Sequence, residues 1–249
     1  MLSSIEIAPA FYIENSPPIG ITGNLAINDL DNTQIHSATI NIISGFASSE
    51  DLLSFNSQFG INGSFNSVTG ELNLNGQALL SEYETVLRSV TYQNISNNPS
   101  DASRTIEFIV NDGENNSNPL SREIEIIEVN DAPVLSTIEP ASTSYTENST
   151  PINVSSSLMI SDVDDIEIDF AVVSINNNFV SGEDVLSFSP QFGINGSFVS
   201  VTGGLTLSGQ AFLSEYETVL RSVTYQNISD DPSGLARTCL LYTSDAADE

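Results

Sequence analysis

An internal repeat constrains the fold of this 249-residue chain more than any other feature. The segment Gln58–Phe65 (QFGINGSF) recurs as Gln191–Phe198, and Ser81–Ser96 recurs unchanged as Ser214–Ser229, both at an offset of 133 residues. Each copy is long enough to bury a hydrophobic core of its own. The sequence therefore predicts two similar domains in tandem.

The extent of the match predicts the domain boundaries. We assign residues 1–133 to the first repeat, with a linker at 129–133, and residues 134–238 to a second, incomplete repeat. After Thr238 the two copies diverge, because the first continues as IEFIVNDG and the second as CLLYTSDAADE. We interpret residues 239–249 as the translation of a sequencing adapter and not as native sequence.

Two observations qualify the ends of the chain. Asp245 falls 133 residues after Asp112, so a genuine, diverged strand stays open as an alternative for the C-terminal segment. At the other end, Met1-Leu2-Ser3 aligns with Val134-Leu135-Ser136, which follows the linker of the first copy. We therefore expect the chain to begin inside a longer array.

The charge balance restricts the possible partners. The chain has 33 acidic and 5 basic side chains, a formal net charge of −28, and no Lys. Nucleic-acid binding needs clustered cations, and anionic lipid would be repelled, so we expect neither nucleic acid nor membrane insertion. Such a chain attracts hard cations, although an acidic surface that serves solubility alone is the simpler alternative. Any export signal or anchor is expected outside this chain, which we place at the cell surface or outside the cell.

Alternating apolar and polar residues, separated by Gly, Pro, Asn and Asp, predict short β-strands in each copy. Seven or so strands in such a length are typical of an all-β, antiparallel Greek-key sandwich of the immunoglobulin type, with a barrel as the alternative. We expect two of these sandwiches in tandem, the second truncated. In the first copy the predicted strands are residues 5–13, 19–27, 37–43, 52–55, 71–74, 90–94, 104–111 and 120–129.

One segment has a helical signature. Residues 81–89 are predicted to form one or two helical turns, with Ser81 as the N-cap and Glu84 completing a capping box. The aromatic residues are assigned to the core: Phe46, Phe55, Phe59, Tyr83 and Tyr92, with Phe179, Phe188, Phe192, Tyr216 and Tyr225 in the second copy.

No catalytic constellation emerges from the sequence, and we expect a non-enzymatic protein. His36 is the only His, and Asp169 replaces it in the second copy. No nucleophile elbow, zinc-binding helix motif or phosphate-binding loop is present. We expect His36 to be a surface residue of a strand.

Acidic residues recur instead at predicted strand ends. In a sandwich whose strands alternate in direction, the loops after every second strand lie at the same end. The loops after strands 19–27 and 104–111 are therefore expected at one end, and the end of strand 5–13 and the linker at the other. An isolated Asp-x-Asp is ordinarily an Asx turn, but here it recurs with other acidic signatures. These signatures are Glu14-Asn15 with Glu147-Asn148, Asp29-x-Asp31 with Asp162-x-Asp164, and Asp112 with the linker Asn130-Asp131-Ala132-Pro133.

In type and order, these signatures resemble the calcium motifs of cadherin repeats. The stretches VLRSVTYQNIS, RTIEFIVNDG and EVNDAPVL are similar to the cadherin-like tandem repeats of large bacterial surface or secreted adhesins. The resemblance implies cadherin-like sandwiches that bind Ca²⁺, a cation that takes six to eight oxygen ligands.

Carried over residue by residue, the resemblance implies three groups of calcium ligands. A junction between the repeats would be built by Glu14, Asn130, Asp131, Asp162 and Asp164. An upstream repeat would be faced by Asp29, Asp31 and Asp112, and a downstream repeat by Glu147. Cadherins also use an Asp-Arg-Glu motif; this sequence has Ser81-Glu82-Tyr83-Glu84 there, which leaves Glu82 and Glu84 as further candidates.

We therefore expect a calcium-binding repeat segment of a large extracellular adhesin, in which Ca²⁺ at the junction rigidifies the array for cell or surface adhesion. Its expected partners are adjacent repeats of the same chain and, beyond them, a homophilic, cell-surface or polysaccharide partner. Two alternatives stay open. One is a carbohydrate- or ligand-recognition module whose acidic loops are merely solvated, and the other is a structural spacer that binds no metal.

Overall fold

The chain forms two compact units, residues 1–129 and residues from 130 onward, each with its own hydrophobic core. The structure is a computed structural model that describes residues 1–245. Residues 246–249, part of the segment interpreted as adapter-derived, lie outside the described residues. The division after Val129 falls at the start of the segment assigned to the linker.

The first unit contains eleven strands and one helix. In chain order these are β1 (Leu2–Ser3), β2 (Ala10–Ile13), β3 (Ile19–Gly20), β4 (Ala26–Ile27), β5 (Gln34–Ser44), β6 (Asp51–Ser54), β7 (Asn62–Asn66), β8 (Glu71–Leu79), α1 (Leu80–Arg88), β9 (Thr91–Asn94), β10 (Arg104–Asn111) and β11 (Leu120–Ile127). They form a six-stranded sheet β2-β11-β10-β5-β8-β7, a three-stranded sheet β3-β9-β6 and a β1-β4 pair.

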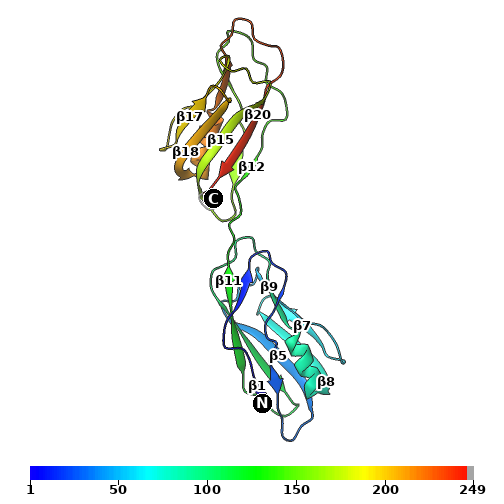
Figure 1. The fold of residues 1–249 in the computed structure, drawn as a ribbon. Coiled ribbons are helices and arrows are strands. Elements are labelled where there is room, and N and C mark those ends of the chain that lie inside the picture. Colours follow the sequence, from blue (N-terminus) through cyan, green and yellow to red (C-terminus); the bar gives the residue numbers. More distant parts are fainter. Residues whose placement is uncertain (246–249) are drawn as a thin grey trace. The chain divides into compact units, whose positions relative to one another are not determined.

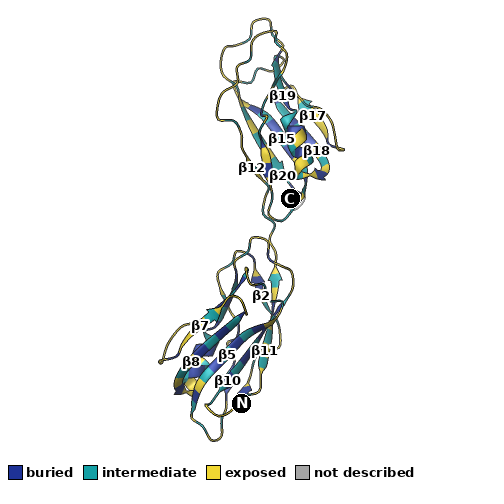
Figure 2. Cartoon of the chain, turned by 180° about the vertical axis from the view of Figure 1, so that it is seen from behind, coloured by how far each residue is buried: buried dark blue, intermediate teal, exposed yellow. Residues whose placement is uncertain are grey.

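These sheets enclose the core as a sandwich. The chain crosses between them from β5 to β6 and from β9 to β10, and the pairings are antiparallel except that of β2 with β11. Buried residues alternate along β5, β8 and β10, which supply the inner face of the larger sheet (Figure 2). The predicted immunoglobulin-like Greek-key sandwich is confirmed, and the barrel alternative is wrong.

The second unit repeats this arrangement with fewer strands. Its elements are β12 (Val134–Ser136), β13 (Ile152–Asn153), β14 (Met159–Ser161), β15 (Glu167–Asn177), β16 (Asp184–Ser187), β17 (Asn195–Val199), β18 (Gly204–Phe212), α2 (Leu213–Arg221), β19 (Thr224–Asn227) and β20 (Thr238–Ser244). They form sheets β17-β18-β15-β20 and β13-β19-β16 and a β12-β14 pair. Most of β20 comes from residues 239–249, the segment that we interpret as adapter-derived, and this strand lies beside β15 (Figure 1). The adapter origin of the segment stays a prediction.

The first two predicted strands are each broken in the structure. Residues 5–13 contribute only β2, and residues 19–27 contribute β3 to one sheet and β4 to another pairing. The cause is a polar kink: the Glu6 carboxylate accepts hydrogen bonds from Thr22 Oγ1 at 2.6 Å and from the Gly23 amide at 3.0 Å. In the second unit Glu139 binds Ser155 and Ser156 in the same way.

Three local predictions were wrong. The helix begins at Leu80 instead of Ser81, and Glu82, not Glu84, accepts the amide hydrogen of Leu79 at 2.8 Å. Strand β7 was missed because it is an edge strand with almost no buried residue and so has no apolar alternation. Phe59 and Phe192 are each 48% exposed, because each has a positive φ in a tight turn that turns the ring outward.

The other aromatic predictions hold, since Phe46, Phe55, Tyr83 and Tyr92 and their second-copy counterparts lie in or against the cores. His36 is an exposed residue of β5, as expected. Neither nine-residue helix of the described chain has the length or apolar content to cross a bilayer.

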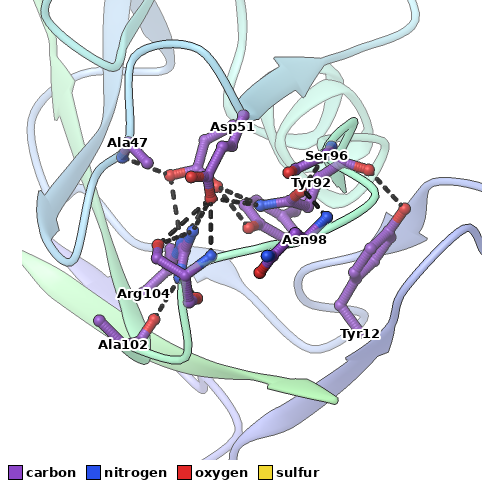
Figure 3. Close-up of polar contacts among 11 residues, drawn as sticks. Tyr12, Ala47, Asp51, Tyr92, Ser96, Asn98, Ala102 and Arg104 are labelled. Atoms are coloured by element: carbon purple, nitrogen blue, oxygen red, sulfur yellow. Dashed lines mark hydrogen bonds and ion pairs between the residues drawn. The ribbon is translucent and has the colours of Figure 1, made fainter. Parts of the chain in front are cut away.

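A buried ion pair joins the two sheets of the first unit (Figure 3). Arg104, at the start of β10, has no exposed surface, and its Nε lies 3.1 Å from Asp51 Oδ1 on β6. Asp51 also accepts hydrogen bonds from Tyr92 Oη at 2.6 Å and from the Ala47 amide at 2.8 Å. Asn94 Nδ2 also donates to Asp51, at 3.2 Å. Four donors therefore bind this one carboxylate, as a buried charge requires.

The second unit contains the same pair. Arg237 Nε lies 3.2 Å from Asp184 Oδ2, and Tyr225 and Asn227 donate to Asp184 Oδ1. Burial opposes ionisation of Asp184, but the hydrogen bonds from Tyr225, the Val180 amide and Asn227 outweigh it, and its pKa lies below the usual range. The carboxylate is therefore charged at neutral pH, as the ion pair needs.

The ion pair predicts a large asymmetry between arginine substitutions. Arg104→Leu would leave Asp51 buried without its cation, so the free energy of unfolding of the first unit is expected to fall by about 3–5 kcal/mol. Arg88→Leu removes a surface pair with Glu84 and a hydrogen bond to the Leu25 carbonyl, and is expected to cost about 1–2 kcal/mol. Calorimetry of the full chain would measure both, and equal losses would contradict a special role for Arg104.

Candidate metal centre

The Asp-x-Asp sequence of the first unit forms a tight turn directly after β4. Asp29 Oδ1 accepts hydrogen bonds from the backbone amides of Asp31 at 3.2 Å and Asn32 at 3.1 Å. These two bonds hold the pKa of Asp29 below its usual range, against the charge of Asp112 nearby. The turn has the Asx geometry expected of Asp beside a turn, and it fixes one carboxylate oxygen of Asp29.

Asp112, after β10, lies at the same end of the unit as this turn. Asn32 Nδ2 donates to Asp112 Oδ2 at 3.1 Å, which joins the two loops directly. The other oxygen of Asp112 accepts the amides of Glu114 at 2.9 Å and Asn115 at 2.7 Å, and these bonds lower its pKa. A small pocket of about 70 Å³ is lined by Asp29, Asp112 and Asn115.

The second unit builds the corresponding turn from Asp162. Its Oδ1 accepts the amides of Asp164 at 2.9 Å and Asp165 at 3.0 Å, as Asp29 does in the first unit. Asp162 Oδ2 is buried and has no hydrogen-bond partner among the described residues. An oxygen that accepts no hydrogen bond has lone pairs available to coordinate a cation.

The linker residues fold onto this turn. The Asp131 amide donates to Asp164 Oδ2 at 2.6 Å, and Asn130 Nδ2 donates to both carboxylate oxygens of Asp245, at 3.3 and 3.2 Å. Asp245 directly follows β20 and is buried. Linker, Asp-x-Asp turn and the end of β20 therefore meet within one unit.

The two units differ in charge at one corresponding position. Asp165 stands where the first copy has Asn32. Burial raises the pKa of Asp165, and the charges of Asp245, Asp162 and Asp164 raise it further. The second unit therefore concentrates four carboxylates that repel one another, whereas Asn32 in the first unit donates a hydrogen bond to the carboxylate of Asp112.

The two Glu-Asn motifs have different environments. Glu14 is 4% exposed, and its Oε2 accepts the Val129 amide at 2.9 Å, one residue before the linker's Asn130. Glu147 is exposed, and its Oε1 accepts from Asn148 Nδ2 at 3.3 Å. The Asn has a positive φ in both motifs, 59° for Asn15 and 56° for Asn148, so the Asn also serves a left-handed turn.

Glu82 and Glu84 both stabilise the helix and its neighbours. Glu82 accepts the Leu79 amide at the helix start. Glu84 Oε1 accepts the Ile27 amide of β4 at 2.8 Å, and its Oε2 lies 3.4 Å from Arg88. These contacts give both residues a structural role, and Glu84 in addition links α1 to the strand that precedes Asp29.

The oxygen chemistry of these loops fits Ca²⁺, which prefers carboxylate, carbonyl and amide oxygens. The residues that would hold it in the second unit are Asn130, Asp131, Asp162 and Asp164, with Asp165 and Asp245 beside them. Among residues 1–245, no three His, Cys, Asp or Glu side chains are already arranged around one point as metal ligands. Several carboxylate oxygens instead accept backbone amides, as at Asp29, Asp112 and Asp162.

Sequence reasoning missed Asn32 and Asp165 and set Asp245 aside. The repeat offset was the available signal, because Asn32 and Asp165 occupy one position and Asp112 and Asp245 another. The offset could not indicate that the residues at these two positions interact with each other. Asn32 donates a hydrogen bond to Asp112 in the first unit, whereas Asp165 and Asp245 repel each other in the second.

Comparison with known proteins gives a local match only. No known family model matches the chain. Halomucin of Haloquadratum walsbyi is 42% identical over 77 residues, which cover 29% of this chain and 1% of halomucin. The chain thus corresponds to a very small part of that relative's length.

The solved structures that match the chain include cadherin domains. Domains EC3-6 of protocadherin gammaB7 match 98% of this chain and 47% of theirs, at 15% identity and a TM-score of 0.25. The C-terminal domain of the Streptococcus pyogenes antigen I/II-family protein AspA matches 84% of this chain and 81% of its own, at 10% identity and a TM-score of 0.26. At TM-scores this low, the strand pairing described above, and not these likenesses, establishes the sandwich.

The repulsion around Asp165 predicts a stabilising substitution. Asp165→Asn removes one of the four carboxylates and offers Asp245 the amide that Asn32 offers Asp112, so the melting temperature of the second unit in chelator is expected to rise. A raised pKa means that the charged form opposes folding, and this penalty is absent below pH 3.8 and grows as the pH rises through the folded pKa. The gain should therefore be seen at neutral pH and vanish in acid.

Thermal unfolding of the full chain, followed by calorimetry in chelator, would measure this gain. Asp230→Asn is the matched control, because Asp230 is an exposed acidic residue of the same unit. An equal effect of the two substitutions would mean that net charge alone, and not the Asp165 cluster, is responsible.

Proposed function

We propose that this chain is a non-enzymatic, calcium-binding repeat segment of a large extracellular adhesion protein. The observation that carries the proposal is the hydrogen bond of 2.6 Å between the Asp131 amide and Asp164 Oδ2, which ties the linker to the Asp-x-Asp turn. Ca²⁺ bound at these oxygens would neutralise the carboxylates and cross-link the linker to the unit that follows it.

The ligands that we propose come from both sides of the linker. Asn130, Asp131, Asp162 and Asp164 belong to the second unit, and Glu14 belongs to the first. Support for Glu14 comes from its burial and from its bond to Val129, the residue next to Asn130. Asp29, Asp31 and Asp112 are proposed to serve a preceding repeat in the same way, and Glu147 a following one.

Charge distribution supports a cation in preference to an anionic or nucleic-acid partner. Each of the five arginines of the chain binds a carbonyl or carboxylate oxygen within its own unit. Among the described residues, no ion pair joins an arginine to Asp29, Asp112, Asp162 or Asp164. Binding at a free Ca²⁺ concentration of one hundred times Kd would stabilise the folded state by about 2.7 kcal/mol.

Adhesion and an extracellular location are the wider part of the proposal. The local identity to halomucin, which extends over only 1% of that protein, supports membership of a long repeated chain. The immunoglobulin-like sandwich and the tandem repeat support a spacer or adhesive stalk. The adjacent repeats are its proposed partners, and beyond them a homophilic, cell-surface or polysaccharide partner.

Calorimetric titration of the full chain with Ca²⁺ tests the proposal. We expect a saturable heat and a rise in the melting temperature of the second unit in Ca²⁺ relative to chelator. Asp164→Ala should weaken this binding and abolish most of the rise, because it removes a ligand that also holds Asp131. Asp230→Ala, which removes the same charge from the same unit, should change neither.

Two outcomes would contradict the proposal. No heat and no shift of the melting temperature with Ca²⁺ would leave a metal-free spacer or a ligand-recognition module. If Asp164→Ala and Asp230→Ala reduced Ca²⁺ binding and the rise in melting temperature equally, Asp164 would have only a structural role in its turn.

A further inference from the structure

Strand β7 lies at one edge of the larger sheet of the first unit (Figure 1). Within the described part of the chain it pairs only with β8, so one row of its backbone N–H and C=O groups faces outward. Strand β17 holds the same position in the second unit and pairs only with β18 there. Residues 62–65 and 195–198 of these strands are identical, so the edge is a feature of the repeat.

The region around this edge is free of charge, although the formal net charge of the chain is −28. Residues 52–70 of the first unit and residues 185–214 of the second contain no Asp, Glu, Lys, Arg or His. The opposite edge of the larger sheet, β2, leads directly into Glu14. Because charges of the same sign repel, two copies of the chain repel each other least where one β7 meets another.

The edge also lacks the features that keep sheet edges apart. Charged residues, Pro and bulges ordinarily protect an edge strand from pairing with another chain. Strand β7 has the sequence NGSFN, and β17 has the sequence NGSFV. Each pairs with its single neighbour in a continuous register, without a bulge. Neither strand is therefore protected against the addition of a further strand.

Exposed apolar side chains lie at both ends of the edge. Phe59, in the loop before β7, is 48% exposed, and Val68, in the turn after it, is 78% exposed. Their counterparts in the second unit, Phe192 and Val201, are exposed by 48% and 75%. Covering these side chains would remove apolar surface from water and would stabilise a contact along the edge.

An antiparallel pairing of β7 with a second β7 is self-complementary. With a two-fold axis at Ser64, this residue lies opposite the partner's Ser64, and Asn62 lies opposite the partner's Asn66. Asn amides both donate and accept hydrogen bonds, so two of them can pair. The same arrangement places the loop of Phe59 beside the turn that contains the partner's Val68. A surface that matches itself in this way is suited to a two-fold dimer.

We propose that β7 is a homophilic contact site, at which the larger sheet of one chain continues into that of a second copy through antiparallel pairing about Ser64. Backbone hydrogen bonds between the two edge strands supply the affinity, and the apolar contacts at both ends fix the register. Strand β17 offers an equivalent site centred on Ser197. This inference rests on the proposed adhesion function, whose homophilic partner it identifies, and it uses none of the proposed calcium ligands.

Like charges placed at the two-fold axis test the site in the full chain. Sedimentation velocity at about 0.15 M salt, where the Debye length is about 8 Å, should show dimers that increase with concentration. A variant with Ser64→Asp and Ser197→Asp and a variant with Ser64→Lys and Ser197→Lys should each dimerise at least about tenfold more weakly, because like charges then face each other. An equimolar mixture of the two variants should restore dimerisation.

Two results would overturn the proposal: monomers of the unmodified chain at every concentration, or opposite effects of the Asp and Lys variants, which would mean that net charge alone decides association. Each measurement is made in chelator and again in Ca²⁺. Dimers that depend on β7 without any binding of Ca²⁺ would contradict only the calcium part of the proposed function. Saturable Ca²⁺ binding by a chain that stays monomeric would contradict only the contact at β7.

Disulfide cross-linking tests the register, in a chain with Cys239→Ser so that no other thiol competes. Ser64→Cys should give a cross-linked dimer with diamide, to which the two thiols lose two electrons and two protons, because directly opposed residues lie within reach of a disulfide. Asn62→Cys alone should not, since the two copies of this residue would lie about 14 Å apart. A mixture of Asn62→Cys and Asn66→Cys chains should cross-link again.

Ser121→Cys is the matched control, because Ser121 is an exposed residue of β11 in the same sheet. Its cross-linking measures random collision between copies of the chain. Ser64→Cys is expected to react faster than this control by at least about tenfold, because pairing raises the local concentration of the second thiol. Equal rates for the two variants would mean that β7 does not pair with β7 and would overturn the proposal.

Discussion

The ion pair between Arg104 and Asp51 is the constraint on which the first sandwich depends. It joins β10 of the larger sheet to β6 of the smaller one, and Tyr92 and the Ala47 amide bind the same carboxylate. Once two opposite charges are buried, neither can be lost without exposing the other to an apolar interior. The second unit repeats the pair as Arg237 and Asp184, so the constraint belongs to the repeat and not to one copy.

With only five arginines and no Lys, each cation is used inside a unit, where it joins sheets, a helix end or loop carbonyls. Among the described residues, Asp29, Asp112, Asp162 and Asp164 form no ion pair with any of these arginines. Their repulsion is greatest around Asp165. An external cation is the simplest means of relieving this repulsion. The hydrogen bond between the Asp131 amide and Asp164 would couple binding of that cation to the conformation of the linker.

Much of the fold could be predicted, because alternating apolar and polar residues indicate the strands and the repeat offset indicates the two domains. Strand β10 was predicted to the residue, and the sandwich follows from the number of strands. The broken strands could not be predicted, because the kink depends on Glu6 binding Thr22, a tertiary contact between polar residues. Edge strand β7 lacks a buried face, so no alternation of apolar residues indicates it. The ring of Phe59 turns outward because of its backbone conformation, which its hydrophobic character does not indicate.

For the candidate site, the sequence indicated which loops matter but not how their side chains pair. Asp29, Asp112, Asp162 and Asp164 were found through recurrence, whereas Asp165 was found only through its neighbours. The central claim is that the acidic end of the second unit binds Ca²⁺. A Ca²⁺ titration followed by amide NMR tests it most directly, up to the millimolar range typical of extracellular modules. The account predicts saturable shifts at Asp131, Asp164 and Asp165, with the amides of Val180 and Asp184 at the buried ion pair unchanged. The absence of saturable shifts at these three residues would contradict it.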